Sequence, residues 1–293
     1  MKPRDYGMLF LLGAIWGASF LFIRLAVPVF GPTALVEFRV ILAGITLLIY
    51  ARMTGHTLNL RENWLKFLIL GALNAAIPFT LIAFGSLNLP ASTSSLLNTT
   101  TPLFTALLSV PFLGDQLTPR RILGLMTGMV GVAIVVGWSQ FDLTTVVVLA
   151  IVSALGGALF YGFGTVYSKR AFKGVPALTM ATGQQLGAAV ALLPLALLNL
   201  PRTMTFDALI PALILALLCT AVAYLLYFTL IKNVGATNTS TVTLIVPMFG
   251  ILWGVVILGE QITLGTLGGF AVIVVGLMLI TGMSFPSRKV QVA

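Results

Sequence analysis

Blocks of about twenty apolar residues, separated by short polar stretches, run along the whole chain. At a rise of 1.5 Å per residue, a helix of roughly this length crosses a hydrocarbon core about 30 Å thick. The pattern predicts an all-α, polytopic membrane protein with ten transmembrane helices. They are expected near residues 6–27, 32–51, 64–87, 90–113, 119–138, 146–168, 176–199, 208–231, 236–258 and 263–284.

The composition agrees with this pattern and narrows the possible functions. Charged residues make up only 8% of the chain, against roughly 25% in a soluble domain, which excludes a water-soluble fold. The net charge of +9 is scattered over short loops rather than gathered in a stripe, so no nucleic-acid partner is expected. The single cysteine, Cys219, can form neither a disulfide framework nor a metal cluster. No motif predicts a metal, a cofactor or a catalytic residue, and we expect no enzymatic activity.

The basic residues indicate the orientation of the helices. An even number of spans puts both termini on one side of the membrane, and 13 Lys and Arg residues fall on that side. Two fall on the other side, Arg24 and Arg202, while Arg39 lies inside the second span. The positive-inside rule therefore predicts that both termini are cytoplasmic.

A shift of 145 residues aligns the chain with itself. The matched positions are Pro102, Phe104, Leu107, Val110, Leu113, Gly114, Gln116 and Thr118 with Pro247, Phe249, Leu252, Val255, Leu258, Gly259, Gln261 and Thr263. The sequence thus predicts two five-helix repeats, residues 1–140 and 141–293, that together form one membrane domain. Because five is odd, the second copy is inverted relative to the first. Inverted repeats are typical of secondary transporters.

The repeated motifs also resemble a known family. Each half ends in Leu-Gly-acidic-Gln-x-Thr, at 113–118 and 258–263, after a Pro-Leu-Phe-Thr-Ala run from residue 102 or a Pro-Met-Phe-Gly run from residue 247. With Phe38-Arg39 in the second span, this pattern resembles the drug/metabolite transporter superfamily, in particular its bacterial ten-helix exporters of amino acids and metabolites. The resemblance implies a multi-pass protein of the bacterial inner membrane. It also implies export of small neutral or zwitterionic metabolites, aromatic or neutral amino acids first, by alternating access, with no obligate protein partner.

Two polar half-helices are candidates for the substrate pathway. The fourth and ninth spans begin with runs of Ser, Thr and Asn that lead to Pro102 and Pro247, expected near the midplane. The predicted substrate-binding residues from these runs are Ser94, Asn98, Thr101, Thr239 and Thr243. The alternative is that they serve as polar contacts between packed helices.

Aromatic and amide side chains within other spans complete the predicted binding site. These are Trp16, Asn74, Tyr161, Gln184 and Tyr224, of which Trp16 and Tyr161 are repeat partners. The prolines Pro78, Pro102 and Pro247 are predicted hinges, because a proline removes a helical hydrogen bond.

Two charged residues lie within the second span. Glu37 is a candidate for proton coupling, although it lies near the outer boundary and could extend to water instead. Arg39 is a candidate clamp for a substrate carboxylate, and a structural role is the alternative.

Three other functions compete with export of amino acids. Among transporters, the alternative is a multidrug or lipid-linked substrate exporter. A membrane signalling or scaffold protein is disfavoured by the short loops. An intramembrane enzyme is disfavoured because it would need paired carboxylates or a nucleophile with its base, and the sequence shows neither. The sequence leaves the coupling ion open, and uncoupled facilitated diffusion is an alternative to antiport.

Overall fold

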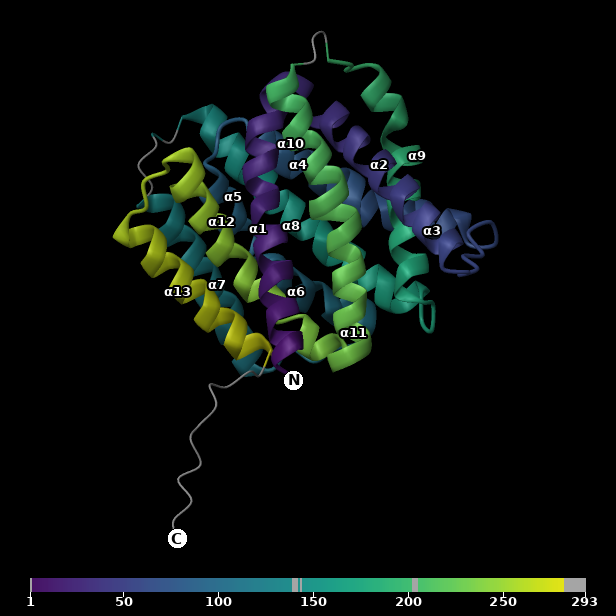
Figure 1. The fold of residues 1–293 in the computed structure, drawn as a ribbon. Coiled ribbons are helices and arrows are strands. Elements are labelled where there is room, and N and C mark those ends of the chain that lie inside the picture. The colour runs from purple at the N-terminus through teal and green to yellow at the C-terminus, as the bar shows by residue number, and fades with distance from the viewer. Residues whose placement is uncertain (1, 139–141, 143, 202–204, 282–293) are drawn as a thin grey trace.

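The computed structural model describes residues 2–138, 142, 144–201 and 205–281, and the regular elements in these ranges are all helices joined by short loops. Nine helical segments there are long and apolar enough to cross a membrane, and a tenth apolar helix, Val242–Leu258, is shorter. The predicted all-α architecture is therefore confirmed. The first helix begins, and the last ends, at the same end of the molecule (Figure 1).

The two halves of the chain supply corresponding helices, although the second half has one element fewer because two of its helices run together across a kink at Gly235. The first half forms α1 (Pro3–Phe30), α2 (Pro32–Met53), α3 (Trp64–Gly71), η1 (Ala72–Ala76), α4 (Ile77–Gly85), α5 (Ala91–Asn98), α6 (Thr101–Leu113) and α7 (Pro119–Gly137). The second half forms α8 (Thr145–Ala171), α9 (Ala177–Leu197), α10 (Phe206–Ala216), η2 (Leu217–Val222), α11 (Ala223–Thr239), α12 (Val242–Leu258) and α13 (Leu264–Thr281). The boundary predicted between residues 140 and 141 lies outside the described residues.

The third and eighth spans each contain a π-helical turn. η1 begins at Ala72 and η2 at Leu217, which are repeat partners at the 145-residue shift. Pro78 follows η1, whereas its partner position in the second half is Ala223. Proline therefore does not account for both turns. Single π turns inside α-helices are frequent at functional sites.

The fourth span is broken between its polar first half and Pro102. The helix ends at Asn98 and resumes at Thr101, so Ser94 and Thr101 do not share one unbroken helix. Pro102 has no N–H for the carbonyl of Asn98, and the Thr101 hydroxyl donates to that carbonyl at 2.9 Å instead. The ninth span is broken between α11 and α12, after Gly235 has bent the chain at φ 83° and ψ 162°.

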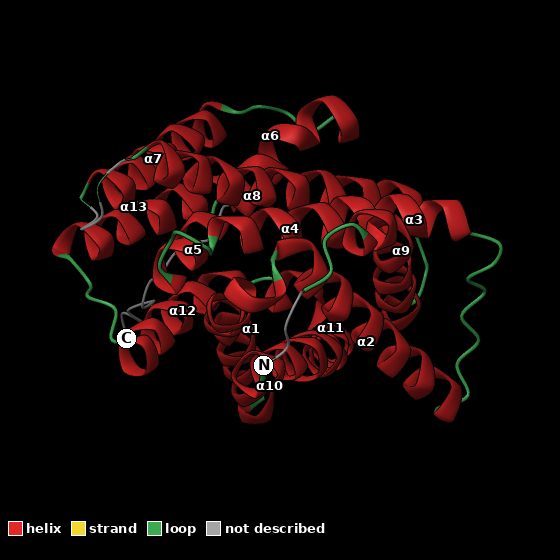
Figure 2. Ribbon diagram, turned by 90° about the horizontal axis from the view of Figure 1, so that it is seen from above, coloured by secondary structure: helices red, strands yellow, loops and turns green. Residues whose placement is uncertain are grey.

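The last spans of the two halves pack against each other as antiparallel helices, and α7 and α13 lie side by side in both views (Figures 1 and 2). Gly124 contacts Gly276, and Gly131 contacts Gly269. Gly124 and Gly269 are repeat partners, and so are Gly131 and Gly276. The two contacts are therefore related by a two-fold symmetry between the halves. A Cβ added to Gly131 would lie 2.8 Å from the Gly269 carbonyl oxygen and 2.7 Å from the Ile273 amide nitrogen.

We expect Gly131→Ala to destabilise the protein, because the added methyl must push two backbones apart, at a cost of about 1–3 kcal/mol. Gly268→Ala, on α13, is the matched control, since a Cβ there meets nothing within 4 Å. Thermal unfolding of the purified variants in detergent measures the difference. Equal melting temperatures for the two variants would contradict this packing.

Candidate functional site

Arg39 is the centre of the candidate site. Its side chain projects from α2, and the residue is only 6% exposed. The Nε–H donates to the Thr220 hydroxyl of η2 at 2.8 Å. The guanidinium carbon lies 3.8 Å from the ring centroid of Phe79 in α4, which is a cation–π contact.

No carboxylate of the described residues forms an ion pair with Arg39, since the ion pair found among them joins Arg121 and Asp115. A guanidinium has five N–H donors, and only the donor on Nε is bonded to the described protein. A hydroxyl and an aromatic face compensate only part of the cost of burying a charge. Arg39 therefore retains hydrogen-bonding capacity for an anionic group.

A chain of hydrogen bonds runs beside this cluster through Gln184 of α9, which is 5% exposed. The Asn74 side-chain amide of η1 donates to Gln184 Oε1 at 2.7 Å, and Gln184 Nε2 donates to the Tyr224 hydroxyl of α11 at 2.9 Å. Three of the predicted residues, from both halves of the chain, are therefore joined directly.

Two aromatic pairs lie in the same region, and each pair joins a residue of the first half to a residue of the second half. The rings of Trp16 and Tyr224 meet edge to face with centroids 6.3 Å apart, and those of Tyr161 and Phe79 do so at 6.0 Å. The 145-residue shift converts Trp16 into Tyr161 and Tyr224 into Phe79. The two contacts are thus one contact made twice by the inverted repeat.

The same symmetry relates Arg39 and Gln184, because the two residues are repeat partners at the 145-residue shift. Arg39 contacts Phe79, and Gln184 contacts Tyr224, the repeat partner of Phe79. The aromatic residues of the site are therefore nearly symmetric between the two halves, whereas its charge is not. One positive charge lies on the first-half side of a site that is otherwise aromatic and neutral.

The predicted residues of the polar half-helices mostly bond to their own backbones. The hydroxyls of Thr101, Thr239 and Thr243 donate to the carbonyls of Asn98, Gly235 and Ser240, respectively. Ser94 is buried and accepts a long bond, 3.5 Å, from the Ser86 hydroxyl. These contacts favour a packing role for the hydroxyls.

Asn98 differs from the hydroxyl residues of its span. Its Oδ1 is buried and has no hydrogen-bond partner in the described structure. No described hydrogen bond or ring contact joins it to the Arg39 cluster.

Glu37 does not extend to water. The residue is 7% exposed, and neither carboxylate oxygen has a hydrogen-bond partner among the described residues. This low exposure disfavours the alternative in which Glu37 extends to water, and a role of Glu37 in transport stays a prediction.

The three predicted hinges lie at different kinds of position. Pro78 follows η1, Pro102 follows the break in the fourth span, and Pro247 lies inside α12. Hinge motion at these prolines stays a prediction.

Sequence reasoning missed Phe79 and Thr220, which contact Arg39 most closely. Phe79 could have been found, because it is the repeat partner of the candidate Tyr224. No comparable signal marks Thr220, since its partner position is Ala75.

Known proteins are similar to this chain over nearly its whole length. Over 292 residues the chain is 26% identical to the transporter YvbV of Bacillus subtilis, covering 97% of this chain and 93% of that protein. It is also 26% identical to the inner membrane transporter YedA of Escherichia coli K12, covering 97% and 94%. PecM of Dickeya dadantii is 24% identical, covering 100% and 96%.

A crystal structure 19% identical in sequence matches with a TM-score of 0.66 and covers 95% of this chain and 96% of its own, which shows the same fold. The family model of the EamA-like transporters matches residues 5–137 and matches again at residues 148–282. This multi-pass membrane protein belongs to the EamA-like transporter family.

Proposed function

We propose that the chain exports small neutral or zwitterionic metabolites, amino acids with aromatic or neutral side chains first, by alternating access. The observation that carries the proposal is the buried guanidinium of Arg39, which lacks a carboxylate partner among the described residues and lies over the ring of Phe79. That ring in turn meets Tyr161 of the second half.

A substrate carboxylate fits the capacity of Arg39. Guanidinium groups bind carboxylates with two parallel hydrogen bonds, and such charge-assisted bonds are stronger where water is excluded. One guanidinium balances one carboxylate. A substrate with several negative charges, such as a phosphate ester, would leave charge uncompensated in this site.

The aromatic residues suit the rest of such a substrate. Trp16 lies between Tyr224 and Tyr227, with centroid distances of 6.3 Å and 5.3 Å. Rings in this arrangement can offer edges and faces to an aromatic or aliphatic side chain. A multidrug exporter of hydrophobic cations would use the same rings, but the Arg39 charge would repel its substrates.

We also propose that both termini are cytoplasmic. The hydrogen bonds of Arg24 support this orientation. Arg24 is one of two basic residues assigned to the outer side, and its NH1 donates to the carbonyls of Ser86 and Leu87 at 2.6 Å and 2.7 Å. Because it fixes a turn of the backbone, it has a structural reason to depart from the positive-inside rule.

Labelling of intact bacterial cells tests the orientation. Asp142→Cys, in the loop before α8, should react with an impermeant maleimide, whereas Ala171→Cys, at the end of α8, should react only after lysis. Cys219 is fully buried and contributes little background. The reverse pattern would invert the proposed orientation.

Arg39→Gln places the residue of the repeat partner at position 39. We expect the preference for phenylalanine over phenylalanine amide to fall roughly tenfold or more, because a charge-assisted hydrogen bond to the carboxylate is lost. Competition for counterflow in liposomes measures this ratio.

Arg24→Gln is the control for Arg39→Gln. It also removes a guanidinium, but one bonded to backbone carbonyls, so we expect lower thermal stability and an unchanged ratio of acid to amide. An unchanged ratio in Arg39→Gln as well would show that Arg39 does not bind the substrate carboxylate.

Trp16→Ala should weaken transport of phenylalanine more than that of alanine, since aromatic contacts contribute roughly 0.5–1.5 kcal/mol beyond burial. The control is Trp253→Ala, which removes an indole that donates to the Ala14 carbonyl at 3.0 Å. That control should lower stability and leave the ratio of the two substrates intact. If both variants preserve the ratio, Trp16 belongs to the scaffold.

A further inference from the structure

The two copies of the Leu-Gly-acidic-Gln motif have the same local backbone. Each ends a helix, and the glycine before the acidic residue has φ of 76° in the first copy and 67° in the second. The Asp115 amide donates to the Ser109 carbonyl at 3.3 Å, and the Glu260 amide donates to the Gly254 carbonyl at 3.0 Å. Both are helix ends closed by a left-handed glycine.

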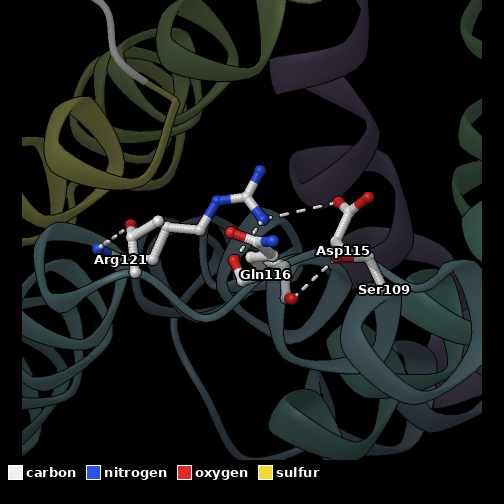
Figure 3. Close-up of polar contacts among 6 residues, drawn as sticks. Ser109, Asp115, Gln116 and Arg121 are labelled. Atoms are coloured by element: carbon white, nitrogen blue, oxygen red, sulfur yellow. Dashed lines mark hydrogen bonds and ion pairs between the residues drawn. The ribbon is translucent and has the colours of Figure 1, made fainter.

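The two carboxylates nevertheless have different partners. Glu260 accepts hydrogen bonds from the backbone amides of Ala91 and Ser92, at 2.6 Å and 3.0 Å. These amides open α5, where the first N–H groups of a helix have no partner within the helix. Asp115 faces Arg121 at 3.5 Å, and its side chain is 44% exposed (Figure 3).

The packing around the motifs differs in the same way. α12 lies against α5, and the absence of a side chain at Gly254 leaves room for the Glu260 carboxylate. The equivalent neighbours in the other half are α6 and the part of α11 that follows Gly235. In the described structure α6 packs on α8 and makes no comparable contact with α11.

Exposure follows this asymmetry. Ser92, which bonds to Glu260, and Ser95, one turn further along α5, are 3% and 1% exposed. Asn238 and Ser240, in the corresponding turn of the second half, are exposed. The molecule is therefore closed where Glu260 contacts α5 and more open where Asp115 has no such contact.

We propose that Glu260 and Asp115 are alternating latches, positioning residues that determine which face of the transporter is closed. The proposal rests on the alternating access proposed above. In the opposite conformation, Glu260 releases the start of α5, while Asp115 leaves Arg121 and accepts from the backbone amides after Gly235. On the proposed orientation, the Glu260 latch is external and the Asp115 latch is cytoplasmic.

The inverted repeat relates the two motifs to each other. The two turns share a backbone conformation but not every side chain, because the repeat partner of Arg121 is Thr266. Whether either carboxylate reaches the start of a helix also depends on the position of the neighbouring helix. An exchange of the conformations of the two halves would exchange the partners. The carboxylates favour closure because a negative charge stabilises a helix N-terminus.

Two cysteine reporters test the latches in the full-length protein in nanodiscs. Ser92→Cys reports on the Glu260 end and Asn238→Cys on the Asp115 end. Glu260→Gln should raise maleimide labelling of Ser92→Cys roughly fivefold and lower that of Asn238→Cys, since one charged helix cap is lost. Asp115→Asn should change both reporters in the opposite directions.

Asp207→Asn is the control, because Asp207 is an exposed carboxylate in the first turn of α10 on the same face as Glu260. It should leave both reporters unchanged. The latches are wrong if Glu260→Gln and Asp115→Asn shift a reporter in the same direction or not at all. They are also wrong if Glu260→Gln raises both reporters together with a lower melting temperature, which indicates loosened packing.

This experiment needs no substrate, which separates it from the proposed function. Reciprocal labelling together with a failure of amino acids to compete in counterflow would support the latches and reject the substrate class. Amino-acid counterflow without reciprocal labelling would support the substrate class and reject the latches.

Discussion

Every backbone amide within the hydrocarbon layer must find its hydrogen-bond partner inside the protein, and the interruptions of the third, fourth and eighth spans show how local structure meets that requirement. Beside the break in the fourth span, the Thr101 hydroxyl bonds to the carbonyl that Pro102 leaves free. In the third and eighth spans, a π turn shifts the register of the bonds without opening the helix. Hydroxyl residues are therefore abundant at the break in the fourth span partly because the irregular backbone there needs them. This reduces the number of polar side chains left for a substrate.

The inverted repeat organises the whole bundle around that constraint. Where α7 meets α13, two glycine pairs that the symmetry exchanges bring the backbones together, and the contact joins the two halves. At the centre, the edge-to-face pairs Trp16 with Tyr224 and Tyr161 with Phe79 repeat the relation. Departures from symmetry are then informative. Arg39 replaces the neutral Gln184, and Glu260 has a helix start that Asp115 lacks.

These two departures correspond to two separate aspects of transport. The first concerns what is bound, because one positive charge in an aromatic site suits a single carboxylate. The second concerns which face is closed, because the Glu260 carboxylate binds backbone amides, a contact that does not depend on the side chains at those positions. The proposed substrate class and the proposed latches therefore depend on different residues.

The sequence by itself determined the number, length and class of the helices, because hydrophobic blocks of membrane-spanning length leave the backbone no alternative. It also determined the repeat, and with it the pairing of Trp16 and Tyr161. Only the tertiary structure decided which candidates meet. It joined Asn74, Gln184 and Tyr224, supplied Phe79 and Thr220 as the partners of Arg39, and left Glu37 buried without a hydrogen bond. Periodicity places a side chain on its own helix, whereas a contact between spans depends on how helices cross, which small residues and interrupted turns set jointly.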